Sequence, residues 1–120
     1  MMEKEYFSET GIFPIMHLIG LRTNDVADPT LARDIYVAFA AAQEIANADL
    51  ANEQALRITL PWLRQEVNRT KAVMGDNFWP NGFTANRKVL ETMIGWSFMD
   101  GMISRRLKPE ELFCHELLTT

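Results

Sequence analysis

Cysteine is almost absent from this 120-residue sequence, since Cys114 is its single example. No disulfide can form within the chain, and a lone thiol is typical of proteins kept in a reducing compartment. The polar, acidic stretch Met1–Thr10 has no apolar region of the kind found in signal peptides, and no apolar run is long enough to cross a membrane. We therefore expect a soluble, cytoplasmic protein that has no membrane partner.

Basic residues are scarce too. Lys and Arg together number 12 against 16 Asp and Glu, which gives a net charge of −4 at pH 7. An acidic balance of this kind offers no surface that would follow a phosphate backbone. We expect no nucleic-acid partner.

Several sequence motifs that are typical of catalytic or metal sites are missing. The sequence contains no GxSxG elbow, no phosphate-cradling glycine loop and no HExxH helix. Cys114 and His115 are adjacent, so their side chains would point in different directions on a helix, and no other Cys or His lies at ligand spacing. We expect no metal site in this chain.

What the sequence does contain is one apolar run that favours a strand, GIFPIMHLIGLR at Gly11–Arg22. Its β-branched and bulky side chains suit a strand over about 12–22 that is buried on both faces. Such a strand needs neighbours to pair its backbone groups, and few other candidates exist in the chain. The sheet would therefore have to be completed by chain outside this sequence or by a second copy.

The remainder of the sequence predicts helices. Asp28 is placed as an N-cap with Pro29 at the first helical position, and Gly75 and Asp100-Gly101 mark two helix ends. Residues 57–60 could form a second, short extended piece. The length suffices for one domain, and this chain alone should be mostly α-helical with one or two strands near the N-terminus. The expected helices cover about 29–50, 61–74, 84–99 and 109–117.

His17 is the strongest candidate for a catalytic residue. An imidazole can act as a general acid or base near neutral pH, and a strand end would hold it rigidly. The alternative is a buried histidine bonded to a neighbouring carbonyl. Arg22 lies five residues further along and could bind a carboxylate, or could be a solvated arginine at the strand end.

The loop 77–83 carries two aromatic residues and two amides before its glycine, Trp79 and Asn81 among them. This composition could stack on and orient a planar ligand, or could form an apolar plug between two helices. Asn86 and Arg87 follow at the next helix N-terminus, where they could add donors for an anion or could be ordinary surface residues.

Five segments in order carry a family resemblance: FPIMHLIGLR, LPWL, MGDNFWPNG, NRKVLET and PEELF. From about Tyr6 to Phe113 the chain resembles the C-terminal third of 4,5-dihydroxyphthalate decarboxylase-like proteins. The resemblance implies an α/β fold of the type II periplasmic-binding-protein kind, of which this chain, 1–120, would be a single partial domain lacking the N-terminal portion. One departure is Asn81, which occupies the tyrosine position of a stretch that usually reads FWPYG in the family.

The resemblance also implies a reaction, the non-oxidative loss of one carboxylate from a dihydroxylated aromatic diacid. No cofactor is required, because a ring hydroxyl para to the departing carboxylate can push electrons as the ring carbon is protonated. On this interpretation His17 is the catalytic proton donor or orients the ligand, and no residue of this chain binds a metal. The residues expected to bind the small aromatic carboxylate are Arg22, Trp79, Asn81 and Arg87.

Other hypotheses remain open at this point. The same kind of fold could serve as a solute-binding module for a small aromatic acid without turnover. Alternatively, the chain could be a small helical protein that self-associates through the strand at 12–22. The isolated chain is expected to be inactive, and to be either a homo-oligomer or part of a longer protein.

Overall fold

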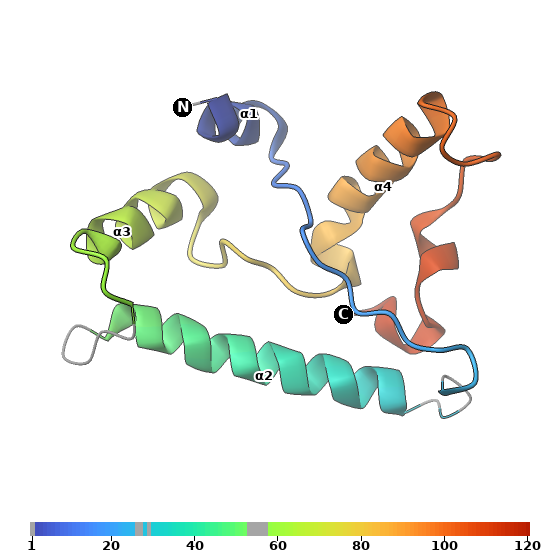
Figure 1. The fold of residues 1–120 in the computed structure, drawn as a ribbon, viewed down its shortest axis with the longest axis horizontal. Helices are drawn as coiled ribbons and strands as arrows, with labels where there is room; N and C mark the ends of the chain where they lie inside the picture. Colours follow the sequence, from blue (N-terminus) through green and yellow to red (C-terminus); the bar gives the residue numbers. More distant parts are fainter. Residues whose placement is uncertain (1, 26–27, 29, 53–57) are drawn as a thin grey trace.

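The computed structural model describes residues 2–25, 28, 30–52 and 58–120 of the chain. These residues form an open, helical arrangement that measures 47 × 35 × 22 Å, with α2 along one side and α3 and α4 standing opposite it (Figure 1). The radius of gyration is 17.1 Å, against about 14 Å for a compact domain of this length. The helices are α1 (Met2–Thr10), α2 (Leu31–Ala51), α3 (Leu63–Met74) and α4 (Phe83–Met99), followed by the 3-10 helices η2 (Pro109–Leu112) and η3 (His115–Leu117).

The predicted strand at 12–22 is wrong, and so is the expected α/β fold of the periplasmic-binding-protein kind. The described residues contain no strand at all, and the segment after α1 runs as an irregular connection past the start of α4 (Figure 1). A strand exists only where a neighbouring strand pairs its backbone, and the described part of the chain supplies none. Ile12 is buried, whereas Leu18 and Ile19 are 59% and 56% exposed. Ile58–Leu60 is not a strand either, and Arg57 lies outside the described residues.

Helix α2 begins at Leu31 with Thr30 as its N-cap, so the predicted cap, Asp28, is two residues too early. Asp28 Oδ1 accepts hydrogen bonds from the backbone N–H of Thr30 at 2.9 Å and from the Thr30 hydroxyl at 2.8 Å. These donors lower the pKa of Asp28, the backbone N–H having the larger effect. Pro29 lies outside the described residues. The helix then runs to Ala51, with an apolar stripe that is buried only at its start, at Ala32.

The best-packed part of the molecule is α4 with the C-terminal segment against it. Phe83, Leu90 and Ile94 are each at most 4% exposed, and the Phe83 ring meets the Phe113 ring at 5.5 Å between centroids. The N-terminus of α4 is closed by Thr120, whose hydroxyl and carbonyl accept the backbone N–H groups of Phe83 and Thr84 at 3.0 and 2.7 Å.

Gly82 makes this close approach possible. Its φ of +97° is a conformation that other residues rarely adopt, and a Cβ built there would lie 2.8 Å from the carbonyl carbon of Thr120. The loop before α4 and the chain around Thr120 can therefore meet only at a glycine.

The predicted helix at 109–117 is instead two short 3-10 helices. Phe113 and Cys114 are extended between them, with ψ angles of 153° and 143°. The extended backbone lets the Phe113 ring reach Phe83, which a continuous helix would not guarantee. Here a tertiary contact has overridden the local helical preference.

Glu111 is the most strongly held carboxylate of this segment. Arg105 contacts it through both carboxylate oxygens, at 3.1 and 2.6 Å, and the Lys108 backbone N–H donates at 2.7 Å. The pKa of Glu111 is lowered from its ordinary 4.5 to about 2, first by Arg105 and then by the Lys108 backbone.

This carboxylate should make stability depend on pH in the acid range. Because the pKa is lower in the folded protein, its stabilising contribution is present above about pH 4.5 and is lost as the pH falls towards about 2. We expect Glu111→Gln to flatten the fall in thermal midpoint between pH 5 and pH 2.5. Glu116→Gln, at an exposed position on η3, is the matched control and should retain the wild-type slope. Identical slopes for wild type and Glu111→Gln would contradict the assignment.

Candidate functional site

A cavity of about 400 Å³ lies between the segment 11–21, the first half of α2, the loop 77–82 and the start of α4. This volume falls in the range of small-molecule sites, which are mostly apolar with a few placed polar groups. The lining matches that description, because its polar side chains are few, namely His17, Tyr36, Asn77, Asn81, Asn86 and Thr120, while its apolar aromatic residues are Phe7, Phe13, Phe39, Phe78, Trp79, Phe83 and Phe113.

Spacing along α2 explains which of its residues reach the cavity. Ala32, Ile35, Tyr36 and Phe39 line it, and these positions follow the period of about 3.6 residues that defines one face of a helix. This face of the first half of α2 thus forms one wall of the cavity. Phe39 is still 58% exposed, so this wall is open to solvent on one side.

The loop 77–82 forms the opposite wall and is held by Asn86 of α4. The Asn86 amide nitrogen donates to the carbonyl oxygens of Pro80 at 2.8 Å and Gly82 at 2.9 Å. Asn86 therefore shapes the loop, a structural use that the sequence alone did not indicate. The Trp79 ring at the tip packs against Phe13, with centroids 5.5 Å apart and planes tilted by 57°.

Besides Asn86, three residues singled out from the sequence line this cavity: His17, Trp79 and Asn81. His17 is exposed, and its imidazole makes no hydrogen bond or ion pair with the described residues. The predicted alternative of a buried histidine bonded to a carbonyl is therefore not what the structure shows. Trp79 is 44% exposed, and the roles of all three in binding or catalysis stay predictions.

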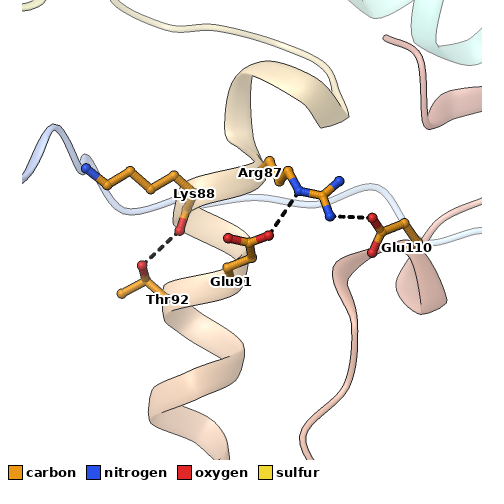
Figure 2. A network of polar contacts seen from close by, with 5 residues as sticks. All are labelled: Arg87, Lys88, Glu91, Thr92 and Glu110. Atoms are coloured by element: carbon orange, nitrogen blue, oxygen red, sulfur yellow. Dashed lines mark hydrogen bonds and ion pairs between the residues drawn. The ribbon is translucent and has the colours of Figure 1, made fainter.

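The two arginines proposed for carboxylate binding lie outside the lining. Arg22 Nε pairs with Asp25 at 3.0 Å. Arg87 Nε contacts Glu91 at 2.9 Å and its Nη2 contacts Glu110 at 2.5 Å, as Figure 2 shows. Both guanidinium groups are already paired with carboxylates of this chain, so a ligand carboxylate would have to compete with them.

The Arg87 network ties η2 to α4. Glu110 is the larger of the two influences that raise the pKa of Arg87, and the Glu110 pKa is lowered by its own backbone N–H and then by Arg87. The guanidinium also lies 5.7 Å from the centre of the Phe83 ring. The Lys88 side chain extends from the side of the helix opposite Arg87 (Figure 2). Its Nζ donates to the Thr10 carbonyl, which ties α4 to the end of α1.

Gln43 is a residue of this region that the sequence analysis missed. Its amide nitrogen donates to the Trp79 carbonyl oxygen at 2.7 Å, and its amide oxygen accepts from Asn81 Nδ2. Gln43 stands four residues after Phe39, so it lies on the same face of α2, one turn beyond the last residue of the cavity lining. That spacing was the available signal.

The described residues contain no group of three or more His, Cys, Asp or Glu side chains that could hold a metal ion. Within the same residues, no helix is both long and apolar enough to span a membrane.

Comparison with known proteins gives one clear relationship, although no family model matches the chain. Over 110 residues, 91% of its length, the chain is 33% identical to a 4,5-dihydroxyphthalate decarboxylase of Comamonas testosteroni. The match covers 33% of that protein, so the chain spans about one third of the length of this relative. The resemblance predicted from the motifs is confirmed: the chain is related in sequence, over most of its length, to 4,5-dihydroxyphthalate decarboxylase.

Proposed function

We propose that the protein carrying this chain decarboxylates a hydroxylated aromatic diacid such as 4,5-dihydroxyphthalate, and that the cavity described above is part of the substrate site. The observation that carries the proposal is the match to 4,5-dihydroxyphthalate decarboxylase over 91% of the chain, which must include most of the cavity lining. The isolated chain is expected to be inactive, because it spans only a third of that relative.

The chemistry of the substrate defines what such a site has to supply. Each carboxylate of 4,5-dihydroxyphthalate has a ring hydroxyl para to it, and this hydroxyl can donate electrons when the carbon that bears the carboxylate is protonated. A new C–H bond forms with the proton of a general acid, and the electrons of the breaking carbon–carbon bond return to the ring as carbon dioxide leaves. The site must therefore offer a proton donor, an apolar slot for the ring and groups that orient its substituents.

The cavity provides candidates for each requirement. The tilted rings of Phe13 and Trp79, together with Phe39 from α2, offer apolar surface for a benzene ring. His17 is the candidate proton donor, since its imidazole is exposed in the lining. The amide of Asn81 is the candidate for orienting a ring substituent.

The test is turnover by the natural gene product that carries this sequence. We expect 4,5-dihydroxyphthalate to give 3,4-dihydroxybenzoate and carbon dioxide in equal amounts, measured by liquid chromatography and by carbon dioxide release. Both carboxylates are equivalent by symmetry, so a single product is expected. Phthalate, which lacks the para hydroxyl, is the matched control and should remain unchanged.

Two outcomes would overturn the proposal. Binding of 4,5-dihydroxyphthalate without any product would assign the protein to the solute-binding class instead. Neither binding nor product would remove aromatic diacids as ligands of this protein.

A further inference from the structure

Two side-chain amides form a chain at the edge of the cavity, and their order is fixed by the backbone. Gln43 Nε2 donates to the Trp79 carbonyl oxygen at 2.7 Å, and Asn81 Nδ2 donates to Gln43 Oε1. Asn81 lines the cavity, whereas Gln43 is not part of the lining. A ligand in the cavity would meet Asn81 and not Gln43.

The orientation of both amides follows from the Trp79 carbonyl. A carbonyl oxygen can only accept a hydrogen bond, so the Gln43 group that faces it must be the NH₂. The Gln43 oxygen then points the other way, and the Asn81 group that meets it must also be an NH₂. Asn81 Oδ1 is consequently held away from Gln43, and it has no hydrogen-bond partner among the described residues.

This arrangement selects the kind of ligand group that can approach Asn81. The side chain presents an acceptor oxygen and the one remaining N–H of its amide. A phenolic hydroxyl both donates and accepts, so it can satisfy Oδ1. A carboxylate can only accept, so it can take the remaining N–H but leaves Oδ1 without a donor. An asparagine free to flip would have no such preference.

We infer that Asn81 binds a ring hydroxyl of the aromatic substrate and that Gln43 is a positioning residue, which holds the Asn81 oxygen toward the ligand. This inference rests on the function proposed above and adds to it the group that the site recognises. In 4,5-dihydroxyphthalate the reacting carbon is para to a hydroxyl. When the hydroxyl is anchored at Asn81, the carboxylate para to it lies across the ring from Asn81. His17 lines the same cavity.

The test is a ligand pair of similar shape in which fluorine replaces both ring hydroxyls and so removes their ability to donate a hydrogen bond. The proposed product, 3,4-dihydroxybenzoate, is compared with 3,4-difluorobenzoate by titration calorimetry on the natural gene product, because neither ligand is turned over and fluorine is close to a hydroxyl in size. We expect wild type to bind the dihydroxy ligand about tenfold more tightly, the effect of one well-made hydrogen bond.

The variants separate recognition from folding. Asn81→Leu should bring the ratio of the two affinities to about one, and Gln43→Leu should lower this ratio while leaving the affinity for the difluoro ligand unchanged. Asn81→Asp has no N–H to donate to Gln43 Oε1, so it should lose the positioning and lower the ratio as Gln43→Leu does. Gln65→Leu and Asn68→Leu, at exposed positions on α3 outside the lining, are controls that should retain the wild-type ratio.

The outcomes distinguish this inference from the proposed function. Equal affinity of wild type for both ligands, or an unchanged ratio in Asn81→Leu, would overturn the role of Asn81 even if 4,5-dihydroxyphthalate is turned over. An unchanged ratio in Gln43→Leu would remove the positioning role alone. Selective binding without turnover would overturn only the proposed decarboxylation, and no binding of either ligand would overturn both.

Discussion

Replacing His17 with glutamine is expected to lower kcat for decarboxylation by about 10²–10⁴-fold, the usual contribution of a general acid. The reason lies in the composition of the cavity. Its lining among the described residues contains no carboxylic acid, lysine, arginine or thiol, so His17 and Tyr36 are the two side chains there that can exchange a proton. Glutamine keeps hydrogen-bonding capacity but cannot deliver a proton to carbon. KM should therefore change much less than kcat.

His115→Gln is the matched control for this measurement. His115 is exposed on η3 and lies outside the cavity lining, so the same chemical change there should leave kcat unaltered. A His17→Gln variant that retains more than half of the wild-type kcat would count against His17 as proton donor. If Tyr36→Phe then loses activity instead, the phenol of Tyr36 is the donor.

Helices α2, α3 and α4 are the part of the fold that local sequence determines well. Asp28 lies just before α2, although Thr30 is its N-cap, and Gly75 and Asp100 follow α3 and α4 directly in the structure. These signals act over one turn of helix, so they can be read without knowledge of the remaining chain. Residues Ile12–Arg22 show the opposite case. Their β-branched and bulky side chains favour an extended backbone, but a strand also needs a neighbouring strand to pair with, and the described residues contain none.

The candidate site likewise contains residues that could be recognised from the sequence and residues whose roles depend on contacts distant in the sequence. Composition was enough to single out His17, Trp79 and Asn81, which the structure brings to one cavity. Gln43 could not be recognised from composition, because its two hydrogen bonds join residues 36 and 38 positions away. The pairing of Arg87 with Glu110 is similarly non-local, so Arg87 appeared available for a ligand when only its sequence neighbours were considered.

Replacing Phe83 with alanine should have the largest effect on stability, a loss of about 3–5 kcal/mol in the free energy of unfolding. Phe83 is 4% exposed, and its ring meets Phe113 edge-on with 5.5 Å between centroids. The Arg87 guanidinium lies 5.7 Å from the centre of the Phe83 ring. Alanine would leave a void among these groups and would remove an aromatic pair that stabilises the extended C-terminal segment. The total stability of a small domain is about 5–15 kcal/mol, so the variant should be close to unfolding.

Phe98→Ala on the same helix is the control, because Phe98 is 44% exposed and has less apolar contact to lose. We expect it to lower stability by about 1 kcal/mol or less in urea unfolding of the natural gene product, followed by far-UV circular dichroism. Comparable small losses for the two variants would contradict the position of Phe83 at the centre of the packing. Comparable large losses would instead show that the exposed end of α4 is covered in the natural protein, by chain or a partner that contacts Phe98. The difference between the two losses in free energy of unfolding therefore tests whether the apolar surface of α4 around Phe98 is exposed in the natural protein.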